Sequence, residues 1–333
     1  MPGVRYRRPG SQNGNPNPND KSESILTSMS WGLEMSSELS PWIDLLLNRR
    51  TFLSGAAVTG AASLLSALPQ GADAQGQGQP ASGVAAPPDT QEQRLSDLVT
   101  ANHILFDQGI VDGLGHVSVR SLKDPSHFFV SRSLAPGLTT LDDILEFDQD
   151  TKPVNARGRQ AYLESFIHGE IFRARPDVHA VVHAHTPAVV AFASTDVPLR
   201  PILHMMDFMR ETPPVFILPP GKGVAYGILV DSNARGASLA KTLGSSIVVL
   251  MRNHGFTVVG PNIASAVSRA HYMIVNAQIA LDALKLGKPT FLDVPEAKGG
   301  VAGTEGPDRG YPLWAARADA AAALVQNFIN KKA

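Results

Sequence analysis

Cysteine is absent from this chain of 333 residues. Disulfide bonds, thiolate nucleophiles and zinc–cysteine sites are therefore excluded, and histidine, aspartate and glutamate remain as the strong metal ligands. Excess charge is also lacking, because 29 basic and 30 acidic side chains leave a formal net charge of −1. A chain this close to neutrality offers no electrostatic footprint for nucleic acid, so we expect no nucleic-acid partner.

Apolar residues are sparse at the N-terminus. Residues 1–44 are rich in Asn, Pro, Gly and Ser, which predicts a disordered extension, and translation could instead begin at Met29 or Met35. Residues 75–90 are mainly Gly, Gln, Pro, Ala and Ser, a composition typical of a flexible linker. The catalytic domain is therefore expected to span residues 91–333.

Residues 45–74 resemble a bacterial twin-arginine export signal. Arg49 and Arg50 precede a Phe-Leu pair, a modest apolar run follows, and the segment closes on Ala-Asp-Ala at Ala74. The run over residues 54–68 is too short and too rich in Gly and Ala for a stable transmembrane helix. We expect cleavage after Ala74, export to the periplasm, and no stable membrane insertion of the mature protein.

Beyond the linker, helical and strand patterns are mixed. This mixture predicts an α/β domain whose central sheet is covered by helices. Apolar residues at helical spacing predict helices over residues 91–108, 158–175, 188–193, 234–243, 264–286 and 313–330. Short apolar and β-branched runs predict strands over residues 116–120, 127–132, 214–218, 246–251 and 256–259, with a further strand in 178–187.

A strand that ends in two histidines is the most informative stretch. Residues 178–187 read VHAVVHAHTP, and the alternation of a strand places His183 and His185 on one face. His254 follows the apolar run 246–250. Three neutral imidazoles around a divalent ion leave coordination positions open, as catalytic metal sites do. A His-x-His pair by itself is more often ordinary core or surface chemistry, so the metal interpretation depends on its surroundings.

A carboxylate lies within reach of this pair. Glu164 and His168 are four residues apart in the expected helix 158–175 and so share a helix face. A helix, a proline turn and a strand fill the gap between Glu164 and His183. Taken alone, Glu164 would be a solvated helix residue. At a metal site it would move a proton, with a pKa raised by burial.

The order of these motifs resembles the class II aldolase and adducin superfamily. The resemblance rests on residues 115–120 (GHVSVR), Glu164, the histidine pair and residues 253–255 (NHG), and it covers residues 93–290. It implies a three-layer αβα fold with a mostly antiparallel central sheet, and a homotetramer with its sites at subunit interfaces. It implies three metal ligands and a catalytic glutamate, which are carried over to His183, His185, His254 and Glu164.

Two departures from the sugar-phosphate aldolases concern the substrate. Those enzymes help to hold phosphate with a Gly-Asn pair in the first motif and with a Ser-Ser pair before the glutamate. This chain has Gly115-His116 and Tyr162-Leu163 at those places. Without the serine hydroxyls, a sugar phosphate is disfavoured as a substrate.

The pattern is similar instead to a decarboxylase branch, whose enzymes act on hydroxylated aromatic or pyridine dicarboxylates with a divalent metal. Arg132 could hold a substrate carboxylate bidentately, with Ser131 and His116 beside it. Arg132 could equally be a structural ion-pair partner, and His116 could hydrogen-bond within its turn. His168 joins Glu164 as a catalytic candidate.

The resemblance thus implies a lyase that acts on a small carboxylate, most simply a decarboxylase. An aldolase that acts on a non-phosphorylated 2-oxo acid or a sugar-derived substrate remains open. So do an oxygenase with ferrous iron and a non-catalytic module like the adducin head. The metal also stays open, because three imidazoles suit zinc, manganese and iron alike.

Overall fold

The computed structural model describes residues 90–206, 208–209, 211–218, 227–293 and 307–332. All of them belong to one compact unit, Ser82–Ala333. The expected N-terminal extension and export signal lie outside the described residues, as does the expected linker except for Thr90. No helix in these ranges combines the length and the apolarity that crossing a membrane requires.

A sheet of seven strands forms the middle layer of the described domain, in the order β3-β2-β1-β4-β7-β6-β5. Neighbouring strands are antiparallel, except for the parallel pair β5 and β6 at one edge. The strands are β1 (His116–Arg120), β2 (Phe128–Ser131), β3 (Ile144–Phe147), β4 (Ala180–Ala184), β5 (Val215–Phe216), β6 (Val248–Met251) and β7 (Gly255–Gly260).

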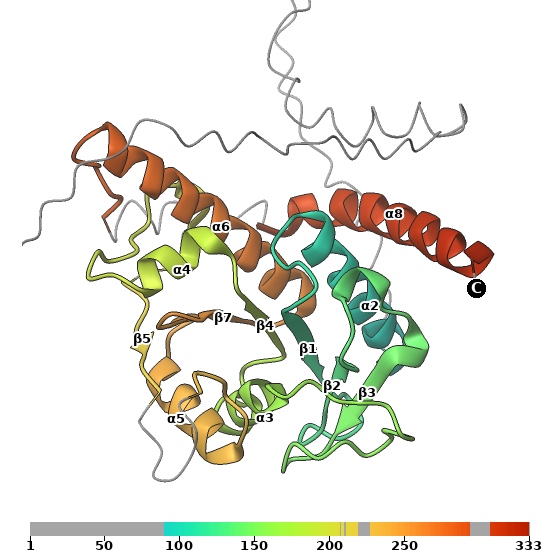
Figure 1. Cartoon of the computed structure of the whole chain (residues 1–333). Helices are drawn as coiled ribbons and strands as arrows, with labels where there is room; N and C mark the ends of the chain where they lie inside the picture. Colours follow the sequence, from blue (N-terminus) through green and yellow to red (C-terminus); the bar gives the residue numbers. More distant parts are fainter. Residues whose placement is uncertain (1–89, 207, 210, 219–226, 294–306, 333) are drawn as a thin grey trace, which may run out of the picture. The chain divides into compact units, whose positions relative to one another are not determined.

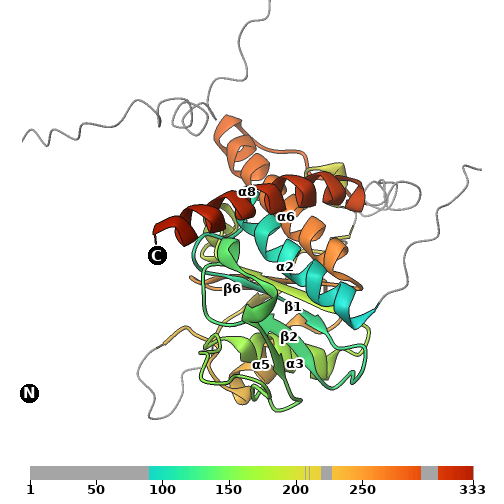
Figure 2. The same ribbon diagram turned by 90° about the vertical axis from the view of Figure 1, so that its right-hand side faces the viewer.

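Helices cover both faces of this sheet (Figures 1 and 2). One face carries α2 (Gln91–Asp107), α4 (Pro187–Ala193) and α6 (Ile263–Leu286); the other carries α3 (Ser165–Ala174) and α5 (Asn233–Leu243). The C-terminal helix α8 (Tyr311–Lys332) packs on α2. Short 3-10 turns lie at Pro136–Leu138, Leu141–Asp143, His204–Met206 and Pro307–Gly310. The expected three-layer αβα fold with a mostly antiparallel sheet is confirmed.

Strand alternation decides which side chains of β4 face which helix layer. Val182 packs into the core beneath α2 and α6, whereas Val181 packs into the core beneath α3 and α5. His183 has the same parity as Val181 and therefore points toward the α3 layer. The register places His116 of β1 and Thr257 of β7 directly beside His183 on its two sides. Three polar side chains from three strands are thereby brought to one place.

Two glycines allow the chain to approach the end of β4 closely. A Cβ on Gly255 would lie 2.2 Å from the carbonyl oxygen of Ala184. Gly115 has φ +97°, and a Cβ there would lie 2.6 Å from a methyl group of Val111. Neither position has room for a side chain, and the backbone at Gly115 is one that L-residues rarely adopt. These contacts bring His254 and His116, the neighbours of the two glycines, toward β4.

The helix expected over residues 158–175 is wrong in its first part. Arg157 and Gly158 have φ of 46° and 81°, and such left-handed residues form a turn rather than a helix start. The helix begins only at Ser165, with Glu164 at its N-cap position. Glu164 therefore precedes the helix instead of lying on its face with His168. The remaining expected helices and strands are found, with ends that differ by a few residues.

Candidate metal centre

Three imidazoles and one carboxylate converge beyond the end of β4. His183 lies in β4, His185 directly follows it, His254 lies in the turn between β6 and β7, and Glu164 caps α3. Their ligand atoms all lie within 4.8 Å of one another. The Nε2 atom of His185 is 3.0 Å from that of His183 and 3.1 Å from that of His254. The structure thus brings together all four residues that the sequence motifs single out for the metal and the proton transfer.

The turn between β6 and β7 presents His254 to this cluster. Asn253 has φ 55°, in the left-handed region that asparagine tolerates better than most residues. The backbone then reverses, and Gly255 begins β7 in close contact with Ala184 of β4. The Asn-His-Gly sequence is therefore explained by the turn: asparagine permits the reversal, glycine permits the approach, and the histidine between them is directed at the cluster.

Hydrogen bonding fixes the ring of His183. Its Nδ1 lies 3.0 Å from the carbonyl oxygen of Phe256 and 3.2 Å from the hydroxyl of Thr257. A carbonyl oxygen only accepts, so Nδ1 carries the proton and Nε2 keeps its lone pair. That lone pair points at the Nε2 atom of His185 in a fully buried position. A nitrogen lone pair that faces two further ring nitrogens and a carboxylate is the donor arrangement of a metal site, so the donor set fits a divalent cation.

The carboxylate of Glu164 is oriented by the backbone. Its Oε1 accepts a hydrogen bond of 2.8 Å from the amide of Val230, while Oε2 lies 3.2 Å from Nε2 of His254 and 3.7 Å from Nε2 of His183. Burial opposes ionisation, but the facing imidazoles outweigh it and hold the pKa of Glu164 far below its ordinary value. The expectation of a raised pKa is therefore wrong, because the electrostatic attraction between the carboxylate and the two facing imidazoles exceeds the effect of desolvation.

The imidazole of His185 favours its neutral form. Burial, together with the neighbouring His183 and His254, lowers the pKa of His185 to about 4. Metal-binding histidines must be deprotonated, so His185 is ready to bind a metal near neutral pH. The rings of His185 and His254 stack with centroids 5.0 Å apart. Among the described residues their Nδ1 atoms have no hydrogen-bond partner, so ring packing rather than hydrogen bonding orients them.

The other two histidines of the predicted site form a second group beside the first. The ring of His116 lies 5.1 Å from that of His183, measured between centroids, and its Nδ1 is 2.6 Å from Nε2 of His168. His168 is completely buried, and its Nδ1 is 2.6 Å from the hydroxyl of Ser118. Because both ring nitrogens are engaged, His168 can influence a substrate only through His116. This placement corrects the expectation that His168 itself contacts the reacting groups.

The third predicted group, Ser131 and Arg132, lies beyond Tyr162. The ring of Tyr162 packs on His116 with centroids 4.6 Å apart, and its hydroxyl donates to the carbonyl of Leu134 at 2.5 Å and accepts from Ser131 at 3.3 Å. The tyrosine hydroxyl hydrogen is thus already used by the main chain, which agrees with the expectation that this position offers no donor to a phosphate.

Arg132 has an ion-pair partner. Its Nε donates to Asp143 Oδ1 at 2.6 Å, and its side chain is 38% exposed. The two terminal amino groups of its guanidinium make no hydrogen bond within the described part of the chain. Both interpretations of Arg132 therefore survive: one edge of the guanidinium is structural, and the other is open to a ligand.

Three partners of the site residues were not among the predicted ones. Thr257 and Ser118 hydrogen-bond to histidines, and the amide of Val230 holds Glu164. Ser118 had a signal, since it lies two residues after His116 and thus on the same strand face. Val230 had none, because its backbone amide reaches Glu164 across 66 residues of sequence.

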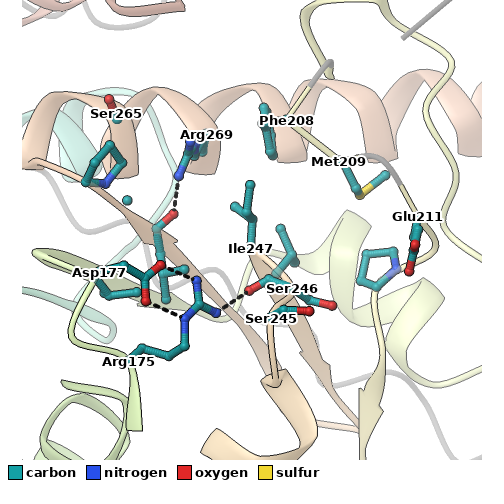
Figure 3. Close-up of a pocket in the computed structure, with 16 residues that line it drawn as sticks. Arg175, Asp177, Phe208, Met209, Glu211, Ser245, Ser246, Ile247, Ser265 and Arg269 are labelled. Carbon is teal, nitrogen blue, oxygen red and sulfur yellow. Dashed lines mark hydrogen bonds and ion pairs between the residues drawn. The ribbon is translucent and has the colours of Figure 1, made fainter. Parts of the chain in front are cut away.

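A separate cavity of about 690 Å³ lies at the ends of β4 and β7 that are far from the metal cluster (Figure 3). Val178 and Gly260 are among the residues that line it. Arg175 at its wall donates two hydrogen bonds to Asp177 and further ones to the carbonyls of Gly244 and Ser246. The charge of Arg175 is thereby neutralised within the protein. None of the four residues of the metal cluster lines this cavity.

Comparison with known proteins places this arrangement in a family context. The family model described as Class II Aldolase and Adducin N-terminal domain matches residues 96–281. Decarboxylase tropJ of Talaromyces stipitatus is 37% identical over 194 residues, which are 55% of this chain and 73% of that protein. The 3,4-dihydroxyphthalate decarboxylase of Arthrobacter keyseri is 32% identical over 211 residues, 60% of this chain and 82% of that protein.

The fold also resembles a solved structure, that of L-fuculose 1-phosphate aldolase from Glaciozyma antarctica PI12. The two agree with a TM-score of 0.57 and 26% identity, over 73% of this chain and 95% of the other. The region that matches the family model, residues 96–281, contains Glu164 and all three clustered histidines.

Proposed function

Because the chain belongs to the class II aldolase and adducin family, we propose that it is a metal-dependent carbon–carbon lyase that decarboxylates a hydroxylated aromatic carboxylate. The observation that carries this proposal is the convergence of three Nε2 atoms and one carboxylate within 4.8 Å. The similarity to two proteins named as decarboxylases supports the choice of reaction. The metal ligands proposed are His183, His185 and His254.

The metal would be zinc, manganese or iron, which imidazole ligands do not distinguish. A divalent ion held by the three histidines supplies Lewis acidity for the electrons released when the carbon–carbon bond breaks. The protein's own contribution is a set of donors that the fold brings together, of which Glu164 and His183 are buried. His183 is oriented by Phe256 and Thr257, so its lone pair needs no reorganisation.

Glu164 is the proposed proton carrier. Its lowered pKa keeps it ionised near neutral pH, so it begins as a base and accepts the proton of the substrate hydroxyl. It then returns this proton to the ring carbon that bears the carboxylate. The carbon–carbon bond breaks, its electron pair enters the ring, and carbon dioxide leaves. The resulting phenolate takes a proton from solvent, so one proton is consumed for each carbon dioxide released.

The substrate carboxylates would be held on the side of the cluster formed by His116, Ser131 and Arg132. Arg132 keeps its open guanidinium edge for this purpose while Asp143 holds the other edge. Tyr162 lies between His116 and the Ser131–Arg132 pair, and its ring offers an apolar wall for an aromatic substrate. A small aromatic dicarboxylate with an adjacent hydroxyl fits these groups chemically.

The proposal is tested with the purified protein after metal removal and reloading with zinc, manganese or ferrous iron in turn. Hydroxybenzoates, hydroxyphthalates, pyridine dicarboxylates and 2-oxo acids are supplied, and carbon dioxide, pyruvate and oxygen are measured. We expect carbon dioxide from a hydroxylated aromatic acid, in proportion to the metal bound. Pyruvate release would identify an aldolase instead, and oxygen uptake would identify an oxygenase.

We also propose that the mature protein is a homotetramer in the bacterial periplasm. The family resemblance motivates the first point, and the twin-arginine sequence in residues 45–74 motivates the second. Light scattering on the purified protein tests the assembly. Fractionation of cells that express the full chain, compared with a chain carrying Arg49→Lys and Arg50→Lys, tests the export.

A further inference from the structure

A chain of three buried side chains leads from the interior of the domain to the metal cluster. The hydroxyl of Ser118 lies 2.6 Å from Nδ1 of His168, and Nε2 of His168 lies 2.6 Å from Nδ1 of His116. Ser118 and His168 have no exposed surface, and His116 is 4% exposed. Both contacts are short, so each must contain one proton between its two atoms.

Neither histidine of this chain has a carboxylate as a hydrogen-bond partner among the described residues, and both rings are buried. A charge on either ring would be taken out of water without a counter-ion, so both imidazoles are neutral. Burial accordingly lowers the pKa of His168 to about 3. Each neutral imidazole has one N–H and one lone pair. The two rings must therefore carry their protons in the same sense along the chain, which leaves two possible directions.

The hydroxyl of Ser118 decides between these directions. Its only hydrogen-bond partner within the described part of the chain is Nδ1 of His168. If His168 donated from Nδ1, the buried Ser118 hydroxyl would have no acceptor, at a cost of about 1–3 kcal/mol. Ser118 therefore donates to Nδ1, and Nε2–H of His168 donates to Nδ1 of His116. The remaining proton of His116 then lies on its Nε2.

The Nε2 atom of His116 is the open end of the chain. It makes no hydrogen bond within the described residues and is not completely buried. Its ring lies between Tyr162 and His183, with centroid distances of 4.6 and 5.1 Å. A group bound beside His183 would thus meet an N–H donor of fixed direction.

We propose that Ser118, acting through His168, locks His116 in the tautomer that carries its proton on Nε2, and that this N–H selects a substrate carboxylate over a neutral group. The selection of a carboxylate by His116 rests on the proposed function, because it assumes a substrate carboxylate next to the metal ligands. The tautomer of His116 does not depend on the proposed function. Ser118 and His168 are positioning residues here, and His116 is the group that touches the substrate.

The first test measures the tautomers directly in the zinc-loaded protein. Nitrogen-15 spectra of histidine-labelled protein distinguish protonated from unprotonated ring nitrogens, and His116→Asn and His168→Asn assign the two signals among the ten histidines. We expect protons on Nε2 of both rings. Protons on Nδ1 of both rings would overturn the proposal without any variant that might fail to fold.

The second test removes the hydroxyl. In Ser118→Ala, His168 loses its fixed donor, so we expect the His116 signal to become a mixture of tautomers. Ser118→Thr restores the hydroxyl and should restore the single tautomer. Ser121→Ala is a matched control, because it removes a buried serine hydroxyl just past the same strand, where it donates to Gln91. An unchanged tautomer in Ser118→Ala would refute the lock.

The third test uses two zinc-site ligands that differ in one group, 2-hydroxybenzoate and 2-hydroxybenzamide. The ratio of their dissociation constants measures the preference for a carboxylate. We expect Ser118→Ala to reduce this preference about twofold, because equally populated tautomers present the Nε2–H donor in only half of the molecules, while zinc content stays equal. An unchanged ratio would refute the selection by His116. If wild-type protein with the expected tautomer binds neither ligand, the proposed function fails and the lock stands.

Discussion

Replacing Glu164 by glutamine separates proton transfer from metal binding at this site. Glutamine has nearly the shape of glutamate, and its amide oxygen can still accept the hydrogen bond from Val230 that holds Oε1 at 2.8 Å. The three imidazoles remain as ligands. We therefore expect the Glu164→Gln protein to fold, to keep its metal, and to lose most of its turnover.

The size of the loss follows from the chemistry assigned to Glu164. A positioned acid–base group contributes about 10²- to 10⁴-fold to a rate, or about 3 to 5 kcal/mol of activation free energy. An amide neither accepts the hydroxyl proton nor returns it to carbon, so the whole contribution should disappear. The measurement is the rate of carbon dioxide release at saturating substrate, with the metal content determined on the same sample.

Glu170→Gln is the matched control. Glu170 is also a buried carboxylate of α3, 5% exposed, and it accepts a hydrogen bond of 2.7 Å from Asn233 on α5. It takes no part in the metal cluster, so its replacement should alter stability more than turnover. A Glu164→Gln protein that holds its metal and turns over within about tenfold of the wild type would refute the role of Glu164.

Three further predictions concern the metal, the backbone and pH. His183→Ala should lose its metal and its carbon dioxide release together, as metal analysis and the activity assay would show; retained metal with full activity would contradict the ligand assignment. Gly255→Ala puts a methyl group 2.2 Å from the carbonyl of Ala184, so urea unfolding should show a loss of about 1–3 kcal/mol, with weaker metal binding as His254 shifts. His168 has a pKa of about 3 when folded against an ordinary 6.5, so the unfolded chain binds more protons between these values. Stability should therefore be full above pH 6.5 and fall as the pH drops toward 3. The decline should be shallower in His168→Gln. If the metal-free wild type and the metal-free variant lose stability with pH at the same slope, His168 does not cause the decline.

Much of the site could be predicted because it depends on local periodicity. The two-residue repeat of a strand places His183 and His185 on one face, and it places Ser118 on the same face as His116. The turn at Asn253 is equally local. These features need only the backbone preferences of short segments.

Other features depend on contacts that no local pattern encodes. The helix-like spacing of apolar residues continues through Glu164, and only the left-handed backbone at Arg157 and Gly158 shows that the helix starts later. The ionisation of Glu164 depends on His183 and His254, which arrive from distant strands. Burial alone predicted the wrong direction for its pKa, because desolvation is only one of the competing contributions.

The sheet order has a consequence for how the protein acquires its metal. Strand β4 pairs with β1 on one side and with β7 on the other, so the ligands meet only after strands distant in the sequence have paired. An unfolded chain has no such site, so the complete set of ligands becomes available only as the domain folds. The compartment in which the chain folds then determines which ions compete for the three imidazoles. If the proposed export follows folding, the cytoplasmic metal supply, and not the periplasmic one, would select the ion that the three imidazoles bind.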